Sequence, residues 1–312
     1  MKRLNQSSVK EFLLLGFSSH PEKQTLLFFV FLTMYTVILV GNLTIFTIIR
    51  MDSRLHTPMY FFLSTLACVD ICFTSMTVPK LLVDLLSAKK TISFSSCIVQ
   101  LHFFLSFGNM DSFLLGIMGF DRYMAICRPL HYAQIMRKRL CILLVLAAWV
   151  IVSLHSSVHS ILASRLLYCG SNEIHHFYCD LPPLLKLSCS DTSANELVLF
   201  TETTIILLTP LLCILLSYFR IAIVIMKIRS SDGRRKAFST CVSHLISIVL
   251  FYGPVLFTYI RPSSAYSLDR DIGISVMYSI VTSMLNPFVY SIRNNDVKEA
   301  LRKLESKIPC HR

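Results

Sequence analysis

The chain has 312 residues, of which 54% are hydrophobic and only 15% are charged, and its mean hydropathy is +0.61. A soluble domain carries about 25% charged residues, so this composition excludes one, and nine Gly and eleven Pro exclude a collagen-like or disordered chain. The net charge of +12 invites a nucleic-acid interpretation. That interpretation requires a basic face on a soluble domain, so the charge must first be located along the chain.

Near the start, Asn5-Gln6-Ser7 is a glycosylation sequon, which predicts an extracellular N-terminus with Asn5 as the acceptor. Apolar runs then follow, each reaching about the 20 residues that cross a bilayer as a helix. Helices satisfy their own backbone hydrogen bonds in lipid, and the ~10-residue alternating segments of a β-barrel are absent from the sequence. The seven runs are Thr25–Ile49, Pro58–Leu86, Cys97–Ile126, Leu140–Ala163, Leu197–Met226, Ala237–Ile260 and Ile272–Ile292.

These runs predict an all-α fold, a bundle of seven transmembrane helices with a short amphipathic eighth helix. We divide the chain into an extracellular N-terminus (1–24), a seven-span membrane domain (25–292) and a cytoplasmic eighth helix and tail (293–312). Four runs carry no charge in their interior, and the others hold the acids discussed below.

The basic residues are concentrated on one side of this topology. With the N-terminus outside, the cytoplasmic segments hold 19 of the 30 Lys and Arg residues and 6 of the 18 Asp and Glu residues, a net charge of +13 against −1 for the rest. This is the positive-inside asymmetry of membrane proteins. It assigns the charge to topology and to contact with lipid, and no nucleic-acid partner is predicted. Four basic residues on the outer side of the first span are exceptions to this rule, namely Lys2, Arg3, Lys10 and Lys23. The cytoplasmic segments hold many more basic residues.

Four of the eleven cysteines fall on the extracellular side, namely Cys97, Cys169, Cys179 and Cys189. That side is oxidising, so disulfides are expected there. Four cysteines allow three pairings, and spacing alone does not choose among them.

Ionisable residues inside the spans are costly in lipid and are functional candidates by default. Asp70 and Asp111 lie midway along the second and third spans, where two carboxylates at similar depth could share a cation or a proton. The alternative is a structural polar cluster with Asn42, Ser112 or Asn286. Glu202, in the outer half of the fifth span, could contact a ligand or face a protein neighbour.

Two other constellations have a structural interpretation beside the functional one. Asp121-Arg122-Tyr123 could be a solvated helix end, although Arg122 can also reach inward. His155 and His159 are spaced i, i+4 as metal ligands can be, but no third ligand is fixed by spacing and polar packing is the better default. The motifs G-x-S-x-G, H-E-x-x-H and the phosphate-binding Gly-rich loop are absent from the sequence, so an enzyme is not predicted.

Taken together, these residues resemble the rhodopsin-like G-protein-coupled receptors and, more narrowly, the olfactory (odorant) receptors of the tetrapod-type class II. The resemblance covers nearly the whole chain and depends on several motifs rather than on Asp-Arg-Tyr alone. The motifs are LHTPMYFFLS (55–64), MAICRPLHY (124–132), SY (217–218), KAFSTCVSHL (236–245), FYGPVLFTYIRP (251–262) and NPFVYSIRN (286–294). Ser283 and Gly119-Phe120 depart from the usual family residues without removing a motif.

The resemblance implies two disulfides, Cys97–Cys179 and Cys169–Cys189. It also implies an activation switch in which Asp121 holds Arg122 at rest and Arg122 moves toward Tyr218 and Tyr290 on activation, beside His244. Asp70, Asp111 and Asn286 would form an inner polar site that could hold Na⁺; no other cofactor and no other metal is expected.

A ligand pocket is expected in the outer half of the bundle, where a small volatile odorant would bias a two-state equilibrium. Helical spacing along the third span, with room at Gly108 and hydrogen-bonding groups at Asn109 and Ser112, suits a mostly apolar pocket. Ordinary helix packing is the alternative explanation for this stripe. The candidate lining is Leu101, Phe104, Leu105, Gly108, Asn109, Ser112, Glu202, Thr203, Ile206, Tyr252, Val255, Leu256, Tyr259 and Ser279.

The expected partner on the inner side is a heterotrimeric stimulatory olfactory G protein that raises cAMP. The tail of its α-subunit would enter a groove near Arg122, Arg234, Arg235 and Lys236. The expected location is the plasma membrane of olfactory cilia. A competing hypothesis is a small transporter or proton-coupled carrier that uses Asp70, Asp111 and Glu202; ligand-driven uptake without a G protein would favour it.

Overall fold

The computed structural model describes residues 9–17, 21–260, 268–293 and 295–307. Within these ranges, seven helical segments are long and apolar enough to cross a membrane, which confirms the predicted fold class. Six are continuous helices: α1 (Pro21–Met51), α2 (Pro58–Leu86), α3 (Phe94–Cys127), α5 (Lys138–Ser164), α7 (Ser193–Lys227) and α8 (Ser231–Ile260). The seventh is built from α9 (Leu268–Val276), the π-helical η3 (Met277–Val281) and α10 (Thr282–Arg293).

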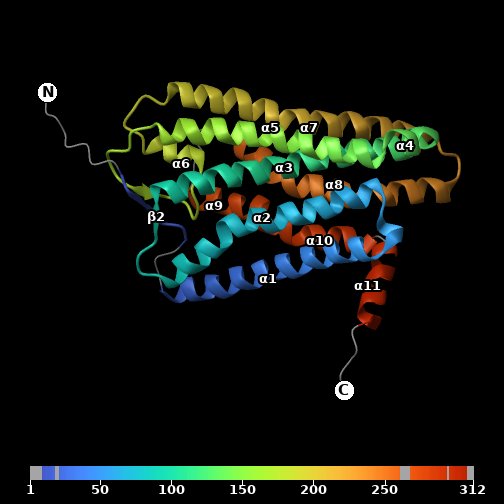
Figure 1. Cartoon of the computed structure of the whole chain (residues 1–312), viewed down its shortest axis with the longest axis horizontal. Coiled ribbons are helices and arrows are strands. Elements are labelled where there is room, and N and C mark those ends of the chain that lie inside the picture. The colour runs from blue at the N-terminus through green and yellow to red at the C-terminus, as the bar shows by residue number, and fades with distance from the viewer. Residues whose placement is uncertain (1–8, 18–20, 261–267, 294, 308–312) are drawn as a thin grey trace, which may run out of the picture.

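The long helices lie side by side along the long axis of the molecule, with short elements at both ends (Figure 1). One end, called the sheet end below, carries β1 (Glu11–Leu14), β2 (Thr91–Ser93), β3 (Glu173–Ile174) and α6 (Leu181–Lys186). The other, called the basic end, carries η1 (Ser53–Leu55), α4 (Pro129–Ile135) and α11 (Asn295–Lys307). Most of the Lys and Arg residues of the loops lie at the basic end.

The sheet end contains a three-stranded sheet of order β2-β1-β3, which the hydropathy pattern did not predict. Phe12 pairs with Ile92 in the antiparallel ladder, and Leu14 pairs with Ile174 in the parallel one. Phe12 and Leu14 alternate with outward residues and are buried, as the period of two of a strand requires. Strands of two to four residues are too short to leave a periodic signal in sequence. For this reason the hydropathy pattern predicted helices alone.

At the basic end, α11 occupies the position expected for the amphipathic eighth helix and turns away from the bundle (Figure 1). Val297 and Ala300 are buried three residues apart, whereas Lys298 and Glu299 are exposed. This spacing places one apolar face on the bundle. Arg54 of η1 bonds Glu299 at 2.7 Å and thereby links α11 to the connection between α1 and α2.

The sides of the bundle are apolar. Large hydrophobic side chains face outward along the long helices, for example Phe200 at 73% and Leu216 at 67% exposure. The buried interior, in contrast, holds polar side chains such as Asn42, Asp70 and Asn286. Such an inverted surface is stable in a hydrocarbon environment and not in water. The chain is therefore a membrane-embedded protein with seven spans.

Candidate functional site

A cavity of about 310 Å³ lies inside the bundle near the sheet end. Helices α2, α3, α5, α7 and α8 and the seventh span all contribute to its wall, and α6 with the residues before it closes it toward the sheet end. Its size is that of a small-ligand site, and apolar area predominates over polar area in its lining. The lining residues are Phe73, Phe104, Leu105, Gly108, Asn109, His155, His176, Asp180, Leu181, Pro182, Pro183, Leu199, Leu207, Phe251, Val255, Asp271, Ser275 and Tyr278.

Five of the residues expected from sequence lie in this lining: Phe104, Leu105, Gly108, Asn109 and Val255. Four of them belong to α3, whose spacing predicted that they share one face. The space expected beside Gly108 is filled, because a Cβ at Gly108 would meet the Phe73 ring at 3.3 Å. Gly108 thus allows α2 and α3 to pack closely through Phe73 and does not itself create the room.

The other expected lining residues lie elsewhere. Leu101 packs in the buried cluster under the sheet, and Leu256 packs beside α3 and α7. Ile206 is not part of the lining, whereas its neighbour Leu207 is. Ser279 bonds the carbonyl of Ser275 one turn away, and it is Ser275 that faces the cavity. The side chains of Glu202, Thr203 and Tyr259 lie outside the described residues, as does Asn5.

Below the cavity, Ser112 and Tyr252 form a hydrogen bond of 2.6 Å between α3 and α8. Both side chains are buried and neither belongs to the lining. Their bond joins the two helices at the inner limit of the cavity. Phe251, which does line the cavity, is the chain neighbour of Tyr252 in this link.

A polar chain leads from the cavity into α5. The amide nitrogen of Asn109 lies 3.4 Å from Nδ1 of His155, and Nε2 of His155 lies 3.2 Å from Nε2 of His159. An amide NH₂ only donates, so it donates to Nδ1 of neutral His155, and Nε2–H of His155 then donates to His159. Among the described residues no group of three or more His, Cys, Asp or Glu side chains is placed to hold a metal ion. These histidines are a hydrogen-bonded pair within the wall.

The roof of the cavity carries two further titratable groups, His176 and Asp180. Burial lowers the pKa of His176 to about 4, and its Nε2 lies 3.2 Å from Oγ of Ser275. Burial raises the pKa of Asp180 to about 6, while Oδ1 accepts the backbone N–H of Leu181 as the cap of α6. The cavity therefore holds a neutral imidazole and a carboxyl group that titrates near neutrality.

Two disulfides fasten the roof to the bundle. Cys97 at the start of α3 is bonded to Cys179, and Cys169 is bonded to Cys189. Both pairs are those that the sequence resemblance implied. Gln100 adds to the first attachment, since its side chain accepts the backbone N–H of Cys179 at 2.9 Å. Tyr178 contacts the hydroxyl of Tyr278 at 2.8 Å and so reaches the seventh span.

A second, much smaller cavity of about 10 Å³ lies deeper in the bundle. Asp111, Ser247 and Asn286 line it, and Phe251 separates it from the upper cavity. Asn286 donates to Oδ2 of Asp70 at 2.9 Å and accepts from Ser247 at 3.3 Å. Oδ1 of Asp70 and Oδ1 of Asp111 are buried and have no hydrogen-bond partner among the described residues. The predicted meeting of Asp70, Asp111 and Asn286 therefore exists in the fold.

Toward the basic end, Asp121 and Arg122 are both buried at the inner end of α3. Asp121 accepts a hydrogen bond of 2.8 Å from Tyr132 of α4. The expected resting ion pair is not formed: among the described side chains, no carboxylate lies within 4.0 Å of the Arg122 guanidinium. Arg122 interacts electrostatically with Asp121 without a direct ion pair, and it also interacts with Tyr218, His244 and Tyr290.

Tyr218 and His244 join the neighbouring helices around Arg122. The Tyr218 hydroxyl lies 2.8 Å from Nδ1 of His244, and Nε2 of His244 lies 3.1 Å from the carbonyl oxygen of Leu115. A carbonyl only accepts, so Nε2 carries the proton and Nδ1 accepts from Tyr218. This short chain connects α7, α8 and α3. Four of the five residues expected to act as a switch thus meet at one place, and Asp121 lies beside them.

Comparisons with known proteins show to which family the chain belongs. A sequence model of the family described as "Olfactory receptor" matches residues 31–307. The chain is 53% identical to rat olfactory receptor 1f45, over 97% of each chain. It is 52% identical to human olfactory receptor 1L6, over 97% of this chain and 87% of that one, and 50% identical to human 1M1, over 98% of each. The chain belongs to the olfactory receptor family.

As a member of this family the protein is a receptor and not an enzyme. An olfactory receptor is an odorant-sensing G-protein-coupled receptor, which fits an internal cavity at one end and a buried arginine at the other. Several cavity residues of this receptor are not among those expected from sequence. His176 and Asp180 come from the loop before α6, and Leu181 begins α6; their positions depend on the disulfides. Asp271 and Tyr278 come from a span that contains a π-helical turn.

The start of α6 carries a sequence signal. Asp180 precedes Leu181-Pro182-Pro183, and an acid before a helix with Pro in its first turn is a cap pattern. It predicts the short helix α6, which roofs the cavity, from sequence alone.

Proposed function

We propose that this protein binds small volatile odorants in the 310 Å³ cavity and activates a stimulatory olfactory G protein at the basic end, which raises cAMP. The observation that carries the proposal is that one helix serves both places. Helix α3 lines the cavity with Phe104 to Asn109 and carries Arg122 thirteen residues further on. At 1.5 Å per residue, that separation is about 20 Å.

The orientation we propose places the sheet end outside the cell and the basic end in the cytoplasm of the olfactory cilium. Two disulfides at the sheet end suit an oxidising compartment. The excess of Lys and Arg at the other end suits the cytoplasmic side. Asn5 would then be available for glycosylation.

The lining favours an apolar ligand that carries one or two polar groups. Phenylalanine and leucine side chains supply most of the surface, and Asn109, Ser275 and Asp180 supply hydrogen-bonding groups. A neutral amide and a hydroxyl both donate and accept, so they suit alcohols, aldehydes and ketones. Asp180 in its carboxylate form accepts only, which favours ligands with an O–H or N–H. Tyr259, Glu202 and Thr203 remain candidates for further polar contacts.

Activation requires the basic end to open. Arg122 is only 9% exposed, because Tyr218, His244 and Tyr290 surround it. A G-protein helix can reach Arg122 only if α8 moves away from α3. That movement breaks the hydrogen bond from His244 to the Leu115 carbonyl, and an odorant drives it only if it binds the open arrangement more tightly. Arg234 and Arg235, exposed on α8, are then suited to contact the partner.

We further propose that the small inner cavity holds Na⁺. Two buried carboxylate oxygens without hydrogen-bond partners need compensation by a cation or a shared proton. The cavity has about the volume of one water-sized sphere. A rise in melting temperature with NaCl over choline chloride, lost in Asp70→Asn, is the expected result; equal melting in both salts contradicts Na⁺.

The deciding experiment screens an odorant panel in cells that express the receptor with or without the stimulatory olfactory α-subunit, with cAMP as the readout. We expect at least one odorant to raise cAMP only when the α-subunit is present. Arg122→Ala abolishes that response while the receptor still reaches the cell surface. Arg139→Ala removes an exposed positive charge from the same end and keeps the response.

Two outcomes contradict the proposal. If an odorant drives uptake of solute or protons without any G-protein dependence, the protein is a carrier. If Arg122→Ala responds like the wild type at equal surface density, Arg122 is not the switch.

A further inference from the structure

A separate hollow of about 500 Å³, larger than the two cavities described above, lies on the outside of the bundle and faces the membrane. We name it the α3–α5–α7 groove after the helices that form it. Its lining is Phe113, Gly116, Ile117, Phe120, Tyr123, Leu144, Thr209, Pro210, Cys213, Leu216, Ser217 and Arg220. Almost all of the surface that lines it is apolar. Neither the odorant cavity nor the switch uses this groove.

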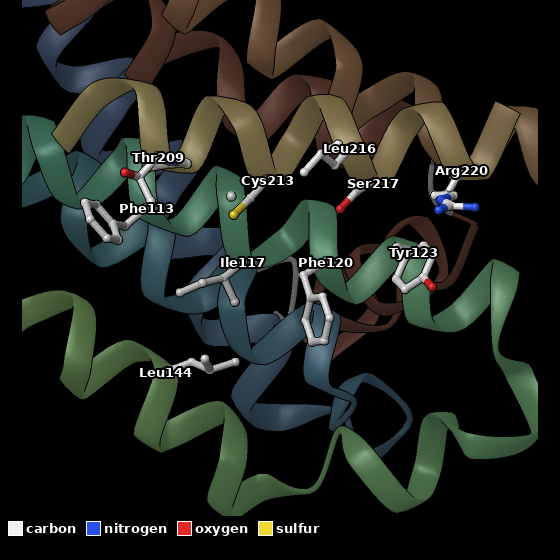
Figure 2. Close-up of a pocket in the computed structure, with 12 residues that line it drawn as sticks. Phe113, Ile117, Phe120, Tyr123, Leu144, Thr209, Cys213, Leu216, Ser217 and Arg220 are labelled. Atoms are coloured by element: carbon white, nitrogen blue, oxygen red, sulfur yellow. The ribbon is translucent and has the colours of Figure 1, made fainter. Parts of the chain in front are cut away.

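The groove exists because α5 leaves a gap beside a tight contact between α3 and α7. A Cβ at Gly116 would lie 3.0 Å from the Pro210 ring, so these two helices touch there. On the other side, α5 contributes only Leu144 to the lining. Figure 2 shows Ile117 and Phe120 projecting from α3 toward the space between α7 and α5, with Leu144 on the α5 side.

The groove has an apolar end and a polar end. Phe113 and Thr209 lie at one end of the row, and Tyr123 and Arg220 lie at the other (Figure 2). Arg220 is exposed, and no carboxylate among the described residues lies within 4.0 Å of it. The polar end of the groove therefore offers an unneutralised guanidinium, the group that binds phosphate in a bidentate manner.

The length of the groove matches one leaflet. Thr209 and Arg220 are eleven residues apart on α7, which is about 17 Å of helix. Half of the hydrocarbon core of a bilayer is about 15 Å thick. A molecule whose charged end meets Arg220 at the basic end would therefore extend its apolar part to Thr209, near the bilayer centre.

We propose that the α3–α5–α7 groove is a binding site for an anionic membrane phospholipid, with its phosphate at Arg220 and one acyl chain along Ile117, Phe120 and Leu144. The charge of the surrounding surface favours an anionic headgroup, because Arg137, Lys138 and Arg139 lie at the same end of α5. A linear chain fits a row of side chains that follows one helix for eleven residues. A neutral sterol would leave the Arg220 guanidinium without a counter-charge.

The test uses the full-length protein in phosphatidylcholine nanodiscs that contain phosphatidylserine with a photoreactive group on one acyl chain. After illumination, labelled peptides are identified by mass spectrometry. We expect labelling to concentrate on the peptides that contain Ile117, Leu144 and Cys213, over lipid-facing positions on other peptides such as Val40 and Val249. Leu144→Trp fills the groove and lowers this labelling severalfold. Its control is Leu143→Trp, because Leu143 faces the membrane outside the groove, and labelling is retained there.

The headgroup is tested by repeating the labelling with photoreactive phosphatidylcholine. Wild type should prefer phosphatidylserine by about fivefold, the ratio that corresponds to about 1 kcal/mol for one basic contact. Arg220→Gln loses that preference, whereas Lys138→Gln, which removes a charge from the same end without touching the groove, keeps it.

Three outcomes overturn the proposal. Labelling spread evenly over all lipid-facing positions means that only bulk lipid surrounds the protein. Displacement of the label by cholesterol and not by unlabelled phosphatidylserine makes the groove a sterol site. An unchanged headgroup preference in Arg220→Gln shows that Arg220 does not select the anionic headgroup. If Leu144→Trp does not fold, the labelled peptides of the wild type and the headgroup preference of Arg220→Gln still decide whether the groove binds an anionic phospholipid.

Discussion

The sheet end of the bundle is held by two disulfides and a sheet, whereas the basic end has no disulfide among the described residues and is held by hydrogen bonds, the Arg54–Glu299 ion pair and apolar packing. At the sheet end, Cys97–Cys179 and Cys169–Cys189 join the loop to α3 and to itself, and β1 pairs on both sides. At the basic end, the helices meet through bonds such as Tyr218 to His244 and Tyr132 to Asp121. An end that must open does so at low cost only where few strong links cross it. The difference suits a fixed ligand cavity and a movable partner surface.

The largest effect on stability is expected from removing a disulfide at the sheet end. Cys97→Ser removes a cross-link between residues separated by 82 positions, and Cys169→Ser removes one between residues separated by 20. In the chain-entropy description the losses are about 4.5 and about 3.3 kcal/mol respectively. We therefore expect Cys97→Ser to reduce thermal stability and surface expression more than Cys169→Ser does. Cys68→Ser, at an exposed free cysteine, is the control. An intact sheet end in Cys97→Ser would show that the disulfide is dispensable.

A smaller effect is expected where the middle of the bundle is packed most tightly. Gly116→Ala places a methyl group 3.0 Å from Pro210 and pushes α3 and α7 apart, at a cost of up to about 3 kcal/mol. Gly253→Ala is the matched control, because nothing lies within 4 Å of its added Cβ and alanine favours a helix interior. Melting of both variants in nanodiscs measures the difference. Equal melting temperatures would show that α3 and α7 can accommodate the added methyl group without a loss of stability.

The smallest effect concerns pH at the roof of the cavity. The pKa of His176 is lowered from 6.5 to about 4 in the fold, so the unfolded chain binds more protons between these values and stability falls as the pH falls through them. From about pH 7 to about pH 5 this costs about 2 kcal/mol. Asp180 acts in the opposite sense, because its pKa is raised from 3.8 to about 6 and protonation favours the fold.

The two groups partly cancel in the wild type, so the comparison must use a variant. His176→Gln is expected to be less stable than the wild type at about pH 7, because it loses the contact with Ser275. The gap in melting temperature should narrow at about pH 5, where the wild type alone loses the His176 contribution. A gap that stays constant from pH 7 to pH 5 would show that His176 titrates normally in the folded receptor.

The two ends also differ in how far sequence could predict them. The basic end follows from motifs that are contiguous in the chain, so Asp121, Arg122, Tyr218, His244 and Tyr290 could be named together. The cavity depends instead on helix rotation and on the loop. Helix α7 is apolar on most of its circumference, so its pattern does not show which face turns inward, and Leu207 lines the cavity where Ile206 was expected.

The fold itself was accessible from sequence because length and hydropathy decide a transmembrane helix with little reference to packing. What could not be predicted is set by long-range packing. The three strands of the sheet pair across more than 75 residues of sequence, and the room beside Gly108 is taken by Phe73 from another helix. Asp70, Asp111 and Asn286, which the resemblance grouped as an inner polar site, do lie close together, as buried polar groups in lipid tend to contact one another.

The central claim is that the cavity at the sheet end and the partner surface at the basic end are coupled, and reciprocity tests it most directly. Odorant affinity is measured on purified receptor in nanodiscs with and without the nucleotide-free stimulatory G protein. Coupling requires that the G protein tighten odorant binding by the factor with which the odorant tightens G-protein binding, on the order of tenfold. Arg122→Ala should remove this gain and leave the affinity without G protein unchanged. Equal odorant affinity in the presence and absence of the G protein would contradict the account.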